Sequence, residues 1–140
     1  MSEPKGAEVT SGSGETSPEV AAVCRSCGRP IMRRRLRRDA AQPLRYCSRA
    51  CRARRSNRTD RQLEAAIVAL LDTRSGTASI CPSEAARRVA GDADWRALLE
   101  PCRRAARRLA HRGQVVITQG DRVVDPGRFR GPIRIRRKRA

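Results

Sequence analysis

The sequence predicts a small metal-bound module that is followed by an α+β domain of the winged helix-turn-helix type, with a disordered tail in front of both. Three observations lead to this prediction. Two close pairs of cysteines lie within residues 23–58, and helical periodicity followed by strand-like runs covers residues 59–140. Residues 1–22 are rich in Gly, Ser, Thr, Glu and Pro. A chain of 140 residues is long enough for two small domains.

Residues 1–22 are expected to form a disordered acidic tail. They carry four glutamates and one lysine, and they have too little apolar surface to offset the loss of chain entropy on folding. They contain no apolar core of a secretory signal, and no stretch of the sequence reaches the 18 apolar residues of a membrane span. We therefore expect a cytoplasmic location, with association with the nucleoid as an alternative, and no membrane partner.

Four of the six cysteines have the spacing of a zinc site. Two residues separate Cys24 from Cys27, three separate Cys47 from Cys51, and nineteen lie between the pairs. Zinc prefers four thiolates in a tetrahedron, and closely paired cysteines in a reducing compartment favour metal over disulfides. Structural Zn²⁺ is the expected cofactor, because four cysteine ligands leave no open position for catalysis. A redox or disulfide role is the alternative.

The residues around these cysteines predict a treble-clef-like arrangement. Gly28 permits a tight turn after the first pair, Pro30 directs the chain into an extended segment, and Ser48 can cap a helix that carries the second pair. The positive end of that helix favours thiolates. A segment of this size cannot build a core alone, so Cys24→Ser is expected to unfold residues 23–58 and to leave the following helices intact.

The charge of the chain predicts a polyanionic partner. The formal net charge is +18, and thirty of the 32 basic residues are arginines, since only Lys5 and Lys138 are lysines. Guanidinium groups match the geometry of phosphate, which favours nucleic acid. DNA is favoured over RNA because single-stranded RNA is commonly gripped by aromatic stacking, and the chain has only three aromatic residues. The expected phosphate contacts of the zinc module, with a solvated basic face as the alternative, are Arg33, Arg34, Arg35, Arg37 and Arg38.

Residues 59–140 show the order of elements of a winged helix. Apolar stripes predict helices over 59–74, 82–90 and 94–112, with a short strand between the first two. Pro101 should kink or split the third helix. Two β-rich runs flank QGDR, a hairpin turn signal, and the final GPIRIRRKR alternates apolar and basic residues as a half-buried strand does.

The third helix of a winged helix enters the major groove, and its wing touches the backbone or the minor groove. Arg96, Arg103 and Arg107 are therefore candidates for contacts with base edges. Winged helices also dock proteins, so a protein-interaction adaptor and a ribosome- or RNA-associated factor stay open as alternatives. The full set of expected contacts in this domain is Arg96, Arg103, Arg104, Arg107, Arg108, Arg134 and Arg136.

No catalytic residue is expected. Cys81 lies at the start of a predicted helix, where the helix dipole lowers the pKa of a thiol, but no matched base is evident. His111 falls on the polar face of the third predicted helix and is interpreted as a surface residue, while Cys102 falls on the apolar face and is interpreted as a core residue. We therefore expect a binding protein and not an enzyme.

Two sets of motifs also resemble known families. CRSCGRP and YCSRACR resemble a short bacterial cysteine-rich family of uncharacterised function. ICPSEAARRV, WRALL, AARRLAHRGQVVITQ, VDP and GPIRIRR resemble a second uncharacterised bacterial family, for which winged-helix character is expected. Together the two resemblances cover about residues 23–137, and they imply a fusion of the two families with no established activity.

Overall fold

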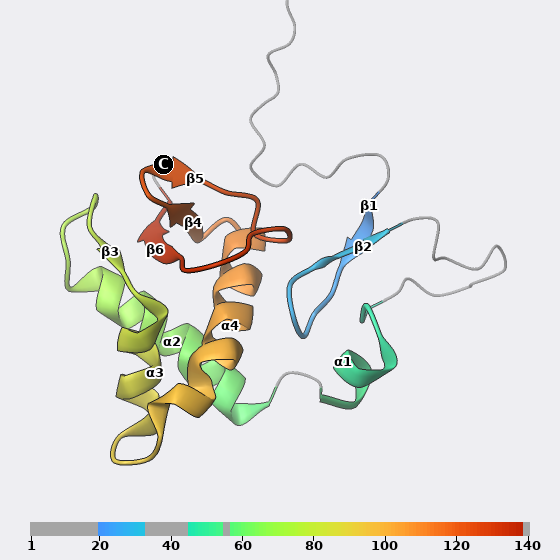
Figure 1. The fold of residues 1–140 in the computed structure, drawn as a ribbon, viewed down its shortest axis with the longest axis horizontal. Helices are drawn as coiled ribbons and strands as arrows, with labels where there is room; N and C mark the ends of the chain where they lie inside the picture. The colour runs from blue at the N-terminus through green and yellow to red at the C-terminus, as the bar shows by residue number, and fades with distance from the viewer. Residues whose placement is uncertain (1–19, 33–44, 55–56, 139–140) are drawn as a thin grey trace, which may run out of the picture.

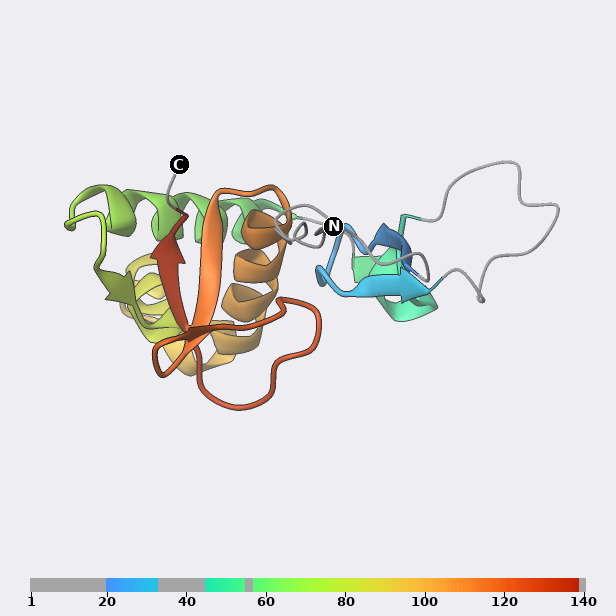
Figure 2. The same ribbon diagram turned by 90° about the horizontal axis from the view of Figure 1, so that it is seen from above.

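The computed structural model describes residues 20–32, 45–54 and 57–138 (Figure 1). Residues 20–32 and 45–54, which carry the four paired cysteines, are called the cysteine module below, and residues 57–138 the helix–sheet domain. Both views show the cysteine module beside helix α4 of the helix–sheet domain (Figures 1 and 2). No helix in the described ranges is long and apolar enough to cross a membrane.

The cysteine module consists of a hairpin and one short helix. Strand β1 (Val20–Val23) pairs antiparallel with β2 (Pro30–Met32), and α1 (Arg49–Arg54) follows in the second segment of the module. Residues 20–22 were predicted to belong to the disordered tail, and this prediction is wrong, because their backbone pairs with β2. The rest of the predicted tail, residues 1–19, lies outside the described residues.

Three helices form one layer of the helix–sheet domain. Helix α2 (Arg58–Asp72) begins with a capping box, in which the Asn57 side chain accepts from the Asp60 backbone and the Asp60 carboxylate accepts from the Asn57 backbone. Helix α3 (Pro82–Ala90) has proline at its first position, as predicted. Helix α4 (Leu99–His111) follows a single 3₁₀ segment, Trp95–Leu98.

Pro101 was predicted to kink the third helix or to split it into residues 94–99 and 101–112, and the helix is indeed interrupted, but two residues before the predicted point. The break lies between Leu98 and Leu99, and Pro101 occupies the third position of α4. The first four N–H groups of a helix have no partner within the helix. Proline therefore costs no hydrogen bond at this position.

The second layer is a four-stranded antiparallel sheet with the order β3-β6-β4-β5. Its strands are β3 (Ser79–Ile80), β4 (Val115–Gln119), β5 (Arg122–Val123) and β6 (Arg134–Arg137). The predicted hairpin joins β4 to β5, where Gln119 pairs with Arg122 and Gly120 takes a positive φ of 61°. The three helices cover one face of the sheet (Figures 1 and 2), and the two layers make up an α/β domain.

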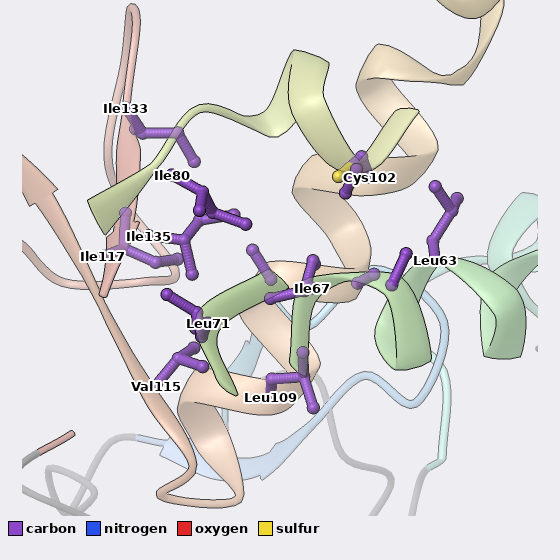
Figure 3. Packing of buried hydrophobic residues seen from close by; sticks show 14 residues of the cluster. Leu63, Ile67, Leu71, Ile80, Cys102, Leu109, Val115, Ile117, Ile133 and Ile135 are labelled. Atoms are coloured by element: carbon purple, nitrogen blue, oxygen red, sulfur yellow. The ribbon is translucent and has the colours of Figure 1, made fainter. Parts of the chain in front are cut away.

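The core between the layers is aliphatic. Leu63 and Ile67 of α2 are fully buried in one cluster with Leu109 of α4 and Ile135 of β6 (Figure 3). Cys102 lies in the same cluster with no exposed surface, so its prediction as a core residue is confirmed. The sheet contributes β-branched residues to this core, which explains why so few aromatic residues suffice.

Truncation of a core residue tests this packing. Ile67→Ala should lower the free energy of unfolding by about 2–5 kcal/mol, because it leaves a cavity between α2 and the sheet. Val123→Ala removes apolar atoms from a side chain that is 57% exposed and should change stability by no more than about 0.5 kcal/mol. Urea denaturation of both variants measures the difference, and equal losses would contradict the proposed core.

Candidate metal centre

The four predicted ligands lie together in the structure. The sulfur atoms of Cys24, Cys27, Cys47 and Cys51 are all within 4.8 Å of one another. The Cys27–Cys47 and Cys47–Cys51 sulfur separations are both 3.6 Å. A tetrahedral zinc ion with Zn–S bonds of about 2.3 Å requires sulfur separations of roughly 3.8 Å. This cluster could therefore bind a metal ion such as zinc.

The first cysteine pair is held by the turn of the β1–β2 hairpin. The Cys24 N–H donates to the Arg29 carbonyl at 2.8 Å, and the Gly28 N–H donates to the Cys24 carbonyl at 3.0 Å. The Cys27 N–H points at the Cys24 sulfur at 3.5 Å. Gly28 takes a φ of 78°, a conformation that side chains with a Cβ rarely adopt. The predicted tight turn at Gly28 is therefore present, and it brings the sulfurs of Cys24 and Cys27 close together.

The second pair lies at the N-terminus of α1. The Cys51 N–H donates to the Ser48 hydroxyl at 3.1 Å, which confirms Ser48 as the cap of this helix. The Arg25 N–H donates to the Arg45 carbonyl at 2.8 Å, and this bond joins the hairpin turn to the chain that leads into α1. The two pairs thus converge through backbone hydrogen bonds as well as through their sulfurs.

The protonation of the cluster depends on its surroundings. Burial opposes ionisation of Cys24, but hydrogen bonds from the backbone of Cys27, Cys47 and Ser26 outweigh it and lower the pKa of Cys24 to about 7. Burial raises the pKa of Cys27, and the negative charge of Cys24 acts in the same direction. Burial also raises the pKa of Cys47. A divalent cation would remove this mutual repulsion and release the remaining protons.

Two arginines of α4 bind main-chain carbonyls of the turn of residues 24–27, which is called the cysteine turn below. Arg108 Nη1 donates to the Ser26 carbonyl at 2.5 Å, and Arg107 Nη1 donates to the Cys27 carbonyl at 3.5 Å. Only 3% of Arg107 and 7% of Arg108 is exposed. A Cβ at Gly28 would overlap the Cβ of Arg107, so glycine also permits the close approach of the turn to α4.

These contacts correct two predictions. Arg107 and Arg108 were expected on an exposed basic face, but both are buried between α4 and the cysteine turn. The prediction that both residues lie on one helix was right, but the helix face that carries them was wrongly expected to be exposed. The expected independence of the two parts on Cys24→Ser also does not fit these contacts, because unfolding of the cysteine turn would uncover both guanidinium groups.

Most of the other arginines that were predicted to contact nucleic acid interact with other residues of the chain itself. Arg103 donates to the Gly131 carbonyl at 2.6 Å and lies over the Phe129 ring. The Arg104 side chain is 11% exposed and lies 3.8 Å from Glu100. Arg134 donates to Ser79 at 2.6 Å. Arg96 is exposed and stacks on Trp95, while Arg136 is only partly exposed.

The arginine run predicted for phosphate contact, residues 33–38, lies outside the described residues. The described part of the cysteine module carries other arginines, and it contains no Asp or Glu at all. All six are exposed, and none forms an ion pair with any described carboxylate. In the sequence, these exposed arginines could have been recognised by the absence of acidic residues from residues 20–32 and 45–54. The six exposed arginines of the cysteine module are Arg25, Arg29, Arg45, Arg49, Arg52 and Arg54.

Substitution of a single cluster cysteine tests metal binding. We expect the purified chain to carry one zinc ion per molecule and Cys51→Ser to lose it, since serine is a poor ligand for zinc. Cys81→Ser, outside the cluster, is the matched control and should retain the ion. Elemental analysis of both variants measures the zinc content, and retention of stoichiometric zinc in Cys51→Ser would contradict the assignment.

Comparison with known sequences places the helix–sheet domain in a family. Residues 60–138 match the family described as "Protein of unknown function (DUF3253)", in agreement with the predicted resemblance of this segment to an uncharacterised family. The fusion with a zinc-binding family stays a prediction. No match was found among curated proteins. Because the matched residues span more than half of the chain, this protein belongs to the DUF3253 family.

Proposed function

We propose that the chain is a nucleic-acid-binding protein, with DNA as the favoured target, whose phosphate contacts come mainly from a zinc-stabilised cysteine module. One observation carries the proposal. The six exposed arginines of the cysteine module have no carboxylate partner among the described residues, whereas all eight described ion pairs lie within the helix–sheet domain. Exposed arginines without carboxylate partners attract phosphate.

Structural zinc supports this arrangement. A segment as small as the cysteine module has little core of its own, so metal binding would supply its folding free energy. The first ligand pair lies in a hairpin turn and the second at the start of a helix, which is the arrangement expected of a treble-clef-like module. Four cysteine ligands leave no open coordination position, and we propose no catalytic role for the ion.

We also propose a winged-helix character for the DUF3253 domain. Its order of elements is helix, strand, helix, helix and then hairpin and strand, as expected for that fold. In this domain, however, Arg107 and Arg108 of α4 contact the cysteine turn, and Arg103 contacts Gly131. We therefore assign the main phosphate contacts to α1 and not to α4. Arg96, in the 3₁₀ segment before α4, is the exposed candidate for a nucleic-acid contact that remains in this region.

The salt dependence of binding tests the proposal. Arg49→Ala/Arg52→Ala removes two exposed charges from α1 and should weaken binding to duplex DNA of any sequence. The slope of log K against log salt should fall by about 0.9 for each phosphate that the variant no longer neutralises. Fluorescence anisotropy with labelled duplex DNA, repeated over a range of salt, measures both effects.

Arg88→Ala/Arg130→Ala is the matched control, because it removes two exposed arginines from the helix–sheet domain and should change the slope much less. Tighter binding to single-stranded or structured RNA than to duplex DNA would favour the RNA-associated alternative. A complex with one protein partner that persists in salt high enough to screen phosphate contacts would overturn the proposal in favour of the adaptor function.

A further inference from the structure

We propose that Arg107 and Arg108 are the positive partners of the metal–thiolate centre, so that zinc binding and the stability of the DUF3253 domain are thermodynamically coupled. This inference rests on the proposed zinc site but concerns a different property. Helix α4 then belongs to the surroundings of the metal, and each part of the chain stabilises the other.

The two guanidinium groups bind the turn that carries the first cysteine pair. Arg107 and Arg108 donate to the carbonyls of Cys27 and Ser26. One of these residues is a ligand and the other lies within the same Cys-x-x-Cys turn. Ser26 is 1% exposed, so this contact is shielded from water. Hydrogen-bond partners just outside the ligands of a metal fix the orientation of those ligands and tune their affinity.

Negative charge is scarce among the ion pairs of α4. Two carboxylates serve five arginines: Glu64 pairs with Arg108 and Arg112, and Glu100 lies 3.6–3.8 Å from three others. Glu100 is about half exposed, so its field is screened by water. The three arginines near Glu100 are Arg103, Arg104 and Arg107.

Arg107 shows this deficit most clearly. Its Nε atom is buried and has no hydrogen-bond partner among the described residues. A buried charge without sufficient compensation is strongly destabilising, so additional negative charge close to Arg107 would stabilise the contact between α4 and the cysteine turn.

The metal centre would supply that charge. Four thiolates outnumber the two positive charges of zinc, so a centre of this type carries a net negative charge. With protonated thiols and no ion, this charge is reduced and the two buried arginines are less well compensated. Zinc binding should therefore stabilise the contact between α4 and the cysteine turn, and by linkage the contact should raise the affinity for zinc by the same factor.

One tryptophan makes this coupling measurable in the full chain. Trp95, the only tryptophan, lies in the helix–sheet domain between Arg87 and Arg96. Its fluorescence therefore reports the unfolding of that domain and not of the cysteine module. Saturating zinc should raise the midpoint of the Trp95 thermal transition by at least about 4 °C relative to the metal-free chain.

Arg108→Met tests the charge while keeping much of the packing volume. It should weaken zinc binding by about 10- to 100-fold and reduce the zinc-dependent shift of the Trp95 midpoint. Arg134→Met is the matched control, because Arg134 contacts Ser79 in the sheet and should leave both quantities unchanged. Competition with a chromophoric chelator measures the zinc affinity.

Gly127→Ala tests the docking without altering any arginine or cysteine. A Cβ at Gly127 would overlap the ring of Pro30 in β2, whereas a Cβ at Gly76 meets nothing within 4 Å. Gly127→Ala should therefore reduce the zinc affinity and the Trp95 shift together, and Gly76→Ala should change neither. This variant keeps the test decisive if Arg108→Met does not fold.

The outcomes separate the two proposals. Stoichiometric zinc with no effect on the Trp95 midpoint would overturn the coupling and leave the zinc site standing. Unaltered zinc affinity in both Arg108→Met and Gly127→Ala would also overturn the coupling. Absence of zinc from the purified chain, with none bound on titration, would instead overturn the zinc site itself and the coupling that rests on it.

Discussion

The burial of Arg107 and Arg108 against the cysteine turn is the contact on which the arrangement of this protein depends. It joins the two parts of the chain through two main-chain carbonyls, Ser26 and Cys27. Arginine suits this role because its rigid fork donates several hydrogen bonds and is more weakly hydrated than an ammonium group. Gly28 permits the approach, since any side chain there would meet Arg107.

The described arginines differ in their surroundings. In the helix–sheet domain many guanidinium groups pair with carboxylates, stack on Trp95 or Phe129, or bind main-chain carbonyls. In the described part of the cysteine module the six arginines are exposed and acidic residues are absent. Net charge alone does not distinguish an arginine that supports the fold from one that is free to meet a ligand.

The two parts also differ in what stabilises them. The helix–sheet domain buries a continuous aliphatic core that includes Ile67 and Ile135. The hydrophobic cluster of the cysteine module consists of Cys24, Cys27, Cys51 and Ile31, with Cys47 partly buried against them. A metal ion held by the four sulfurs would add to its cohesion, as do the hydrogen bonds from the helix α4 that lies beside it. A shared boundary of this kind makes the folding of one part sensitive to the chemistry of the other.

The sequence by itself determined the local features: the four clustered cysteines, the Ser48 cap, the break near Pro101 and the half-buried final strand. Each of these follows from spacing or from the conformational limits of one residue type, which act over a few positions. Only the tertiary structure decided which face of α4 is open. Helical periodicity separates an apolar from a basic face, but it cannot show that a turn some eighty residues earlier covers the basic one.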